Sequence, residues 1–549
     1  MASLSSPSLD RLRTDARALH RAYDAGDPQA HARVTRVTAR PAGTVLRHAD
    51  ALHVIAREAG FRSWPHLIAA NEVQRLDPTA QVQRLRQAVT QGQHGMVDLL
   101  CAALPDICAT DLHLACALYD LPMVTQILAQ DAASAHAAKG VADPMTEAPQ
   151  GAGHPSLSPL VALAFSRHHL ARPDLRGDAL LIADLLVTKG ADVNDAVPGD
   201  HPLSVLYGAL SHARHMPLAQ WLLDHGANPN DAETLYHATE LDDIAGLRMV
   251  LAAGADPRGT NALLRAMDFH RHDMVSLLLT HGAQADEAAP AMVPALHHAA
   301  RCGSNAAMVN LLLDHGADPA QQYEGATAYA FARVFGNAAA ADAIKARGAV
   351  TPLTPDEALL AQAASGQTTG GPGSTGQFID PARLPDAYRN IIRTIVHMPG
   401  KLDHIKRLVA LGLEYDRPDA QGVTPVQAAG WEGLPEVMAY LLSLRPDLGH
   451  VNSYGGTLLG AIVHGAEHAP DIGAPARGSD PDDSTKPRGG VSEMRAPETC
   501  APIRDHQTCL EIVLRHGVAL PRALLVQIRR EDIAACLTDW AERYPGQVV

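Results

Sequence analysis

The chain has 549 residues, which is too long for one ordinary globular core, so we expect several domains or a repeat array. Only 4% of the residues are aromatic although 46% are hydrophobic, which suits thin, repeated helix layers built from Ala, Leu and Val. The formal net charge of −15 argues against a nucleic-acid-binding surface, and no apolar run approaches the ~18–20 residues of a membrane span.

The first residues and the cysteines indicate the compartment. Residues 1–10 are Ser-rich and lack the basic and then apolar pattern of a secretory signal peptide. The seven cysteines include no C-x-x-C pair, and we interpret them as reduced, packed side chains in a cytosol. Zinc sites usually need closer ligand pairs, so we expect no metal and no other cofactor.

Residues 9–75 follow a helical pattern that differs from the rest of the chain. Residues 49–58 predict an amphipathic helix that Gly60 ends. Ser63 is the expected N-cap of the next helix, with Pro65 in its first turn. We expect Trp64, at this helix start, to seal the segment onto the first repeat, with a binding role as the alternative.

One phrase then recurs, in which an apolar helix end is followed by Gly, a small residue and often Asp or Asn. Its clear copies contain Gly190, Gly226, Gly254, Gly282, Gly316 and Gly348, and weaker copies contain Gly412 and Gly517. Glycine can end a helix in the left-handed conformation, and the Asp, Asn or Pro that follows turns the chain.

A second phrase opens each unit, most clearly in residues 424–433 (TPVQAAGWEG) and 294–303 (PALHHAARCG). It combines a capping residue, a short helix and a break, after which a second helix has apolar residues at helical spacing. We expect roughly eleven units, near 83–108, 111–132, 158–193, 201–230, 233–257, 261–286, 294–320, 326–350, 383–416, 423–448 and 456–518.

The two alternating phrases resemble the ankyrin repeat, which opens T-P-L-H-x-A-A-x-x-G and closes L-L-x-x-G-A-D-x-N. The resemblance covers about residues 83–518, and residues 60–67 (GFRSWPHL) look like the N-terminal module of many bacterial ankyrin proteins. It implies an all-α, helix-turn-helix solenoid, stabilised by the stacking of neighbouring units, that binds proteins.

Three interruptions divide the chain. Residues 138–157 read as a loop, 364–385 as a flexible linker, and 466–502 as a disordered insertion poor in apolar residues. The predicted domains are therefore an N-terminal helical module (1–80), a first ankyrin sub-array (81–363), the linker (364–385), a second sub-array containing the insertion (386–520) and a C-terminal helical cap (521–549).

The sharpest sign of catalysis is an H-x-x-E-H motif formed by His464, Glu467 and His468. On a continuous helix this order places two metal ligands and a general base on one face, as in inverted zinc peptidases. Gly465 lies inside the motif, Pro470 follows it, and no second ligand pattern supplies a third ligand. A metal-dependent hydrolase is therefore the least favoured function, and we expect no catalytic residues.

The chain has 29 histidines, many of them at repeat framework positions. His225, His281, His315 and His516 each precede a closing Gly, where a histidine can bond the last helix carbonyls. His297 takes the His position of the opening phrase. We expect structural roles for these residues rather than a metal or pH-sensing site.

The resemblance implies that the variable positions before the mid-unit Gly line a concave binding face. These positions hold Asp268 and Phe269, Arg301 and Cys302, Val334 and Phe335, and Trp431 and Glu432. Aromatic and Arg side chains at solvent-facing positions are typical of interface hot spots, so we predict that Phe269, Arg301, Phe335, Trp431 and Glu432 bind a partner. The alternative is that each side chain packs against a neighbouring unit.

The favoured function is a bacterial, cytoplasmic scaffold or inhibitor that binds another protein, without nucleic acid or membrane partners. The alternative is a secreted effector that acts on a host protein. A translocation reporter fused to residues 1–60 distinguishes the two.

Overall fold

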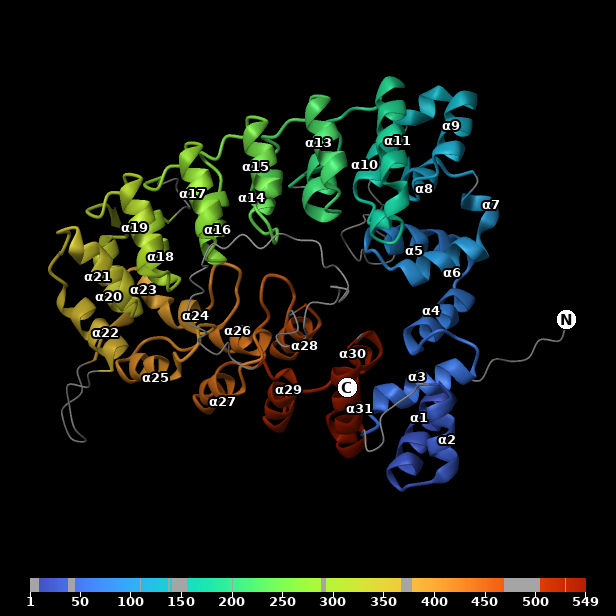
Figure 1. Cartoon of the computed structure of the whole chain (residues 1–549). Helices are drawn as coiled ribbons and strands as arrows, with labels where there is room; N and C mark the ends of the chain where they lie inside the picture. The colour runs from blue at the N-terminus through green and yellow to red at the C-terminus, as the bar shows by residue number, and fades with distance from the viewer. Residues whose placement is uncertain are drawn as a thin grey trace. The chain divides into compact units, whose positions relative to one another are not determined.

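The structure is a computed structural model that describes residues 9–37, 45–108, 110–136, 139–140, 156–199, 201–287, 293–366, 378–468, 504–528 and 530–549 (Figure 1). The chain divides into two compact units: unit 1 comprises Met1–Arg265 and Thr280–Gly282, and unit 2 comprises Ala266–Leu279 and Ala283–Val549. As the sequence predicts, the fold is all-α and is built from ankyrin-type helix pairs.

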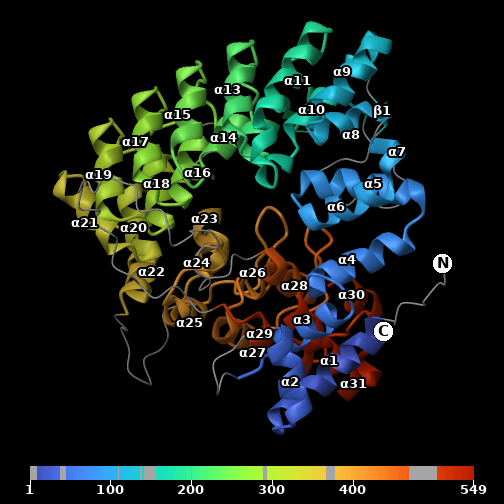
Figure 2. The ribbon, with the colours of Figure 1, turned by 45° about the vertical axis from the view of Figure 1, so that its right-hand side comes forward.

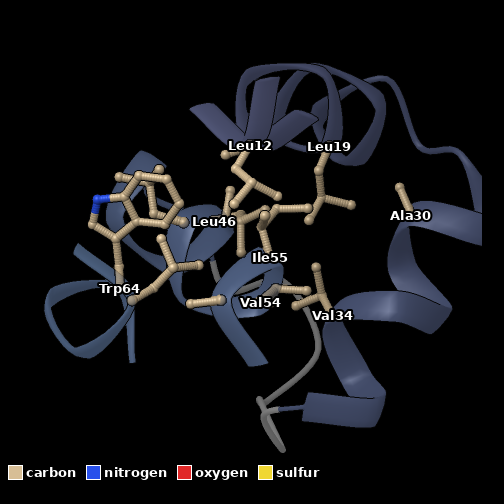
Figure 3. Close-up of a cluster of buried hydrophobic side chains, with 13 residues drawn as sticks. Leu12, Leu19, Ala30, Val34, Leu46, Val54, Ile55 and Trp64 are labelled. Atoms are coloured by element: carbon tan, nitrogen blue, oxygen red, sulfur yellow. The ribbon is translucent and has the colours of Figure 1, made fainter. Parts of the chain in front are cut away.

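Unit 1 begins with four helices, α1 (Leu9–Asp24), α2 (Pro28–Val37), α3 (His48–Glu58) and α4 (Trp64–Arg75). The predicted caps are confirmed, because α3 ends before Gly60 and the Ser63 side chain accepts a hydrogen bond from the His66 N–H at 3.3 Å. Trp64 is buried and belongs to a hydrophobic core that also contains Leu12 of α1, Val34 of α2 and Ile55 of α3 (Figure 3). The expectation that Trp64 packs onto the first repeat is wrong, since Val73 at the far end of α4 joins the repeat core instead.

Five helix pairs follow in unit 1: α5 (Pro78–Thr90) with α6 (His94–Ala103), α8 (Leu112–Ala117) with α9 (Leu121–Gln130), α10 (Pro159–Ala164) with α11 (Arg176–Thr188), α12 (Val205–Tyr207) with α13 (Met216–Asp224), and α14 (Thr234–Ala238) with α15 (Ala245–Ala252). The second helices α9, α11, α13 and α15 stand in a row (Figures 1 and 2). The shorter elements are α7 (Pro105–Cys108), η1 (Ala132–His136), η2 (His168–Leu170), η3 (Pro173–Leu175), the π-helical turn η4 (Gly208–His212), and the antiparallel pairs β1 (Lys139–Gly140) with β2 (Ser156–Leu157) and β3 (Ala196–Val197) with β4 (Leu203–Ser204).

The boundary between the units falls inside α16 (Ala262–Asp268), whose pair partner is α17 (His272–Thr280). Five further pairs lie in unit 2: α18 (Ala295–Arg301) with α19 (Ala306–Asp314), α20 (Ala328–Phe335) with α21 (Ala338–Ala346), α24 (Ile391–Ile395) with α25 (Leu402–Ala410), α26 (Pro425–Trp431) with α27 (Pro435–Ser443), and α28 (Leu458–His468) with α29 (His506–Arg515). The hairpin of β5 (Gln322–Tyr323) and β6 (Ala326–Thr327) precedes α20, while η5 (Pro381–Arg383) and α23 (Asp386–Arg389) precede α24. At the C-terminal end of the chain lie α30 (Arg522–Gln527), α31 (Glu531–Arg543) and η6 (Pro545–Gln547).

One helix of unit 2 has no counterpart in the predicted units. Helix α22 (Pro355–Ser365) begins with a reciprocal capping box between Thr354 and Glu357 and packs against α20 and α25. The buried Tyr388 hydroxyl donates to the Glu357 carboxylate at 3.0 Å, which ties α23 to α22. This extra helix covers a surface that the repeat pattern leaves exposed.

The repeat phrases form the predicted turns, and in unit 1 their Asn side chains also contact the next unit. The eight closing glycines have φ between 78° and 100°, and His225, His315 and His516 each bond the carbonyl four residues earlier, at 2.7–3.0 Å. In unit 1 the Asn194 Oδ1 atom accepts from the Asn228 N–H at 2.7 Å, and Asn230 Oδ1 accepts from the Asp256 N–H at the same distance. These side chains bond the turn of the next unit, a stacking contact that the turn propensity of Asn did not predict.

The predicted loop and insertion fall mostly outside the described residues, which omit 141–155, 367–377 and 469–503. Half of the predicted linker is described, at 364–366 and 378–385, where η5 forms and Ile379 and Leu384 are buried. The gap at 469–503 separates the two helices of one pair, because α28 packs against α29. The predicted insertion starts too early, since α28 continues without a break to His468. Gly465 therefore lies inside a helix and does not interrupt it.

Candidate functional site

The predicted binding residues lie at the C-terminal ends of four first helices in unit 2, namely α16, α18, α20 and α26. We define the first-helix strip as Asp268, Phe269, Arg301, Cys302, Trp431 and Glu432, which end or directly follow α16, α18 and α26. Phe269 is 47% exposed and Trp431 is 39% exposed, while Arg301 and Glu432 are half-buried. Each of these four side chains therefore has surface available for a partner.

The placement of Phe269 depends on the residue that follows it. His270 stands where the other copies have glycine, yet it takes the same left-handed conformation, with φ 53° against 74° at Gly303 and 65° at Gly433. A side chain in this conformation costs of order 1 kcal/mol, which the packed helix pair sustains. Phe269 thus occupies the position of Cys302 and Glu432 in the other copies.

Phe335 is a correction to the prediction, because it is only 2% exposed. Its ring stacks on Phe331 with centroids 5.5 Å apart and also meets the ring of Tyr388 at 6.4 Å. Residues outside the repeat pattern cover it, as a Cβ built on the adjacent Gly336 would lie 3.1 Å from the Ala364 Cβ of α22. Phe335 is therefore a core residue that presents no ring to a partner.

Trp431 contacts His506 through its backbone and His464 through its ring. Its carbonyl accepts a hydrogen bond from His506 Nε2 at 2.9 Å, and its ring lies 4.8 Å from the His464 ring of α28. Glu432 forms a salt bridge of 2.9 Å with Arg504. The backbone beneath the exposed indole is thus hydrogen-bonded to α29, and its ring has an aromatic neighbour on α28.

Arg301 and Cys302 belong to a polar group centred on the buried His298. The His298 Nε2 atom lies 2.8 Å from Asp268 Oδ1 and 3.2 Å from Cys302 Sγ, and Arg301 Nη2 lies 3.2 Å from His298 Nδ1. Burial raises the pKa of the Cys302 thiol to about 12, so the free thiol is not a nucleophile at neutral pH. Because the carboxylate and the sulfur both face Nε2, the group also lacks the arrangement of a catalytic triad.

The strip carries a further ionisable residue that sequence reasoning missed. His397, which follows α24, is desolvated enough to have a lowered pKa, while the Glu432 and Asp268 carboxylates act in the opposite direction. Both carboxylates therefore lie close enough to His397 to influence its pKa. Its helix lies in the irregular ninth unit, where no repeat phrase marks the binding positions.

The H-x-x-E-H motif lies on the continuous helix α28, with the His464 and His468 rings 3.9 Å apart. His468 Nδ1 is 2.9 Å from the His464 carbonyl oxygen, a bond along the helix itself. Among the described residues, Asp268, His298 and Cys302 form a group of three possible metal ligands whose ligand atoms all lie within 4.8 Å of one another. Within the described part of the chain, the residues of the H-x-x-E-H motif belong to no such group, and the His464 ring packs beside Trp431.

The histidine of the opening phrase has the predicted framework role. His297 Nε2 is 3.0 Å from the Ala326 carbonyl, and in unit 1 His113 Nε2 is 3.0 Å from the Leu157 carbonyl. Both residues bond the segment that leads into the next unit. Both residues are buried, and their observed contacts are structural.

Comparison with known protein families agrees with this geometry. Residues 235–323 match the model of ankyrin repeats in three copies. These residues comprise the fifth to seventh helix pairs, and ankyrin repeats indicate a protein-interaction domain. No curated protein matches the chain. In the part of the chain that the structure describes, no helix is both long enough and apolar enough to cross a bilayer.

Proposed function

We propose that this chain is a scaffold that binds a partner protein through the first-helix strip and catalyses no reaction. The exposure of Phe269 and Trp431 at matching ends of first helices carries this proposal. Large aromatic side chains on rigid supports are typical centres of protein interfaces, and Arg301 with Glu432 adds charges of both signs beside them. This is the face that the ankyrin resemblance makes concave, and we place the interaction in the cytoplasm.

The partner is expected to present an apolar surface with polar groups around it. Two separate aromatic anchors favour a folded protein over a short peptide, because both must be covered for the full affinity. The net charge of −15 disfavours nucleic acid as the ligand.

A site-specific cross-linking experiment tests the surface. A photo-reactive amino acid is placed at position 269, at position 431 or, as a matched control, at position 181, where Leu181 is 56% exposed on the second helix α11 of unit 1. We expect positions 269 and 431 to capture the same protein in the native cell and position 181 to capture none. Equal capture at all three positions, or different proteins at 269 and 431, contradicts the proposal.

Affinity measurement with the captured protein then tests the anchors. Trp431→Ala removes an exposed hot-spot side chain and should weaken binding at least ~10-fold, whereas Leu181→Ala should leave the affinity unchanged. A Trp431→Ala variant that is folded and binds with the affinity of the original chain refutes the role of the strip.

A further inference from the structure

Three different metal-ligating side chains meet at one end of the first-helix strip, independently of any partner protein. His298 and Cys302 are four residues apart, and the Cys302 N–H still donates to the His298 carbonyl at 2.9 Å, so both side chains lie on the same helical face. Asp268 reaches the same point from the end of α16. From these positions, we propose that Asp268, His298 and Cys302 bind a zinc ion.

The distances between the ligand atoms fit a zinc coordination sphere. With zinc–nitrogen and zinc–oxygen bonds of about 2.0–2.2 Å and a zinc–sulfur bond of about 2.3 Å, the ligand atoms of a tetrahedral site lie about 3.4–3.6 Å apart. The observed separations are 2.8 Å from His298 Nε2 to Asp268 Oδ1, 3.2 Å from Nε2 to Cys302 Sγ, and 3.8 Å between sulfur and carboxylate oxygen. Shifts of a few tenths of an ångström in the side chains bring all three atoms to bonding distance.

A metal ion would replace a proton in this arrangement. His298 Nε2 carries either one proton or one lone pair, yet it faces both a carboxylate oxygen and a sulfur atom. Because the Arg301 guanidinium donates to Nδ1, the proton sits on Nε2 and is donated to Asp268, and the Cys302 thiol faces the same carboxylate oxygen. A cation at this point instead accepts a lone pair from all three atoms. The mixture of nitrogen, sulfur and oxygen ligands favours zinc over magnesium or calcium, which prefer oxygen.

One side of the proposed site is buried and the other side is exposed to solvent. His298 is 5% exposed, Cys302 is half-buried and Asp268 is exposed. Three protein ligands leave the fourth tetrahedral position toward the surface, where water or a side chain of a partner completes the sphere. The thiol loses its proton on binding zinc, so the affinity falls as the pH is lowered.

Arg301 opposes the metal, which yields a distinctive prediction. When Nε2 binds zinc, the His298 Nδ1 atom carries a proton, and the Arg301 guanidinium 3.2 Å away must then turn aside. Arg301→Gln removes this positive charge and keeps a polar side chain. It is therefore expected to raise the zinc affinity several-fold, in contrast to the loss expected for a ligand variant.

Cobalt(II) titration of the chelator-treated, full-length chain tests the site. We expect one equivalent of Co²⁺ to produce a thiolate charge-transfer band in the near ultraviolet and tetrahedral ligand-field bands in the visible, both abolished by added Zn²⁺. Cys302→Ser should remove the charge-transfer band and weaken zinc binding at least ~10-fold. The matched control Cys536→Ser alters another half-buried thiol of unit 2 and should retain both the band and the affinity.

Two results of the cobalt titration would overturn the proposal. Absence of the charge-transfer band at one equivalent in the folded chain overturns the proposal, and so does a band that persists in Cys302→Ser. Circular dichroism confirms that each variant is folded, and if His298→Ala fails to fold, Cys302→Ser and Arg301→Gln still decide. Partner binding is not involved, so failure of this test leaves the proposed scaffold function standing.

Discussion

The approach of α26 and α28 in unit 2 makes Gly465 sensitive to a single methyl group. A Cβ atom at Gly465 would lie 2.1 Å from the Trp431 carbonyl oxygen and 2.8 Å from the Trp431 Cα atom. Ordinary contact begins near 3.4 Å, so Gly465→Ala must separate the two helices by about 3.4 − 2.1 = 1.3 Å. Since the obstacle is backbone and not a flexible side chain, no rotamer change relieves it.

Two effects of opposite sign set the magnitude. Alanine improves helix propensity by about 1 kcal/mol over glycine, whereas overpacking of a fitted core costs about 1–3 kcal/mol. A displacement of this size falls at the upper end of that range, so the free energy of unfolding should fall by about 2 kcal/mol. Gly460→Ala is the matched control in the same helix, because its Cβ would meet only Thr457 Oγ1, at 3.4 Å. The control should gain up to about 1 kcal/mol.

Urea denaturation followed by far-ultraviolet circular dichroism compares the two variants, and hydrogen exchange of peptides from α28 locates the change. We expect the urea midpoint to fall for Gly465→Ala and to rise for Gly460→Ala, with faster exchange in α28 only for the former. If both variants are stabilised, α26 and α28 do not approach as described. The structural reason for a glycine inside the H-x-x-E-H motif is then wrong.

Three further perturbations follow from buried groups. Burial lowers the pKa of His169 and of His215 to about 4, below the ~6.5 of an unfolded chain. The unfolded chain therefore binds protons first as the pH falls, and the free energy of unfolding decreases between pH 6.5 and pH 4 by up to about 3 kcal/mol for each residue. Thermal melting at pH 7 and pH 5 measures this loss, and His169→Leu should reduce it. Asn337→Asp keeps the N-cap bond of α21 to the Ala340 N–H but loses the Nδ2 bond of 2.9 Å to the Ser304 carbonyl. It should lower the free energy of unfolding measured by urea denaturation by about 1–3 kcal/mol, and an unchanged midpoint is the contrary result. Phe331→Ala empties a fully buried position between Phe335 and Tyr388 and should cost about 3–5 kcal/mol by the same assay; a loss below 1 kcal/mol contradicts this packing.

Local chemistry determined much of this fold from the sequence alone. Glycine at a closing position, a cap at a helix start and apolar residues at helical spacing act within a few residues, so the helix pairs and the left-handed turns could be read directly. The resemblance to ankyrin repeats implied that Phe269, Arg301 and Trp431 are surface positions, because each lies before a mid-unit break. Ser63 and Gly60 likewise delimit their helices through bonds to immediate neighbours.

Only the tertiary structure shows which residues cover a given position and which side chains come together there. Phe335 has the same place in its unit as Glu432, yet α22 and Tyr388 bury it, and no repeat phrase announces those elements. The Trp64 ring packs with apolar side chains of α1–α3 and not with those of the first repeat. The spacing of His298 and Cys302 was readable in the sequence, but the carboxylate that completes the group comes from Asp268, thirty residues before His298, and only the stacking of two first helices brings it within 2.8 Å.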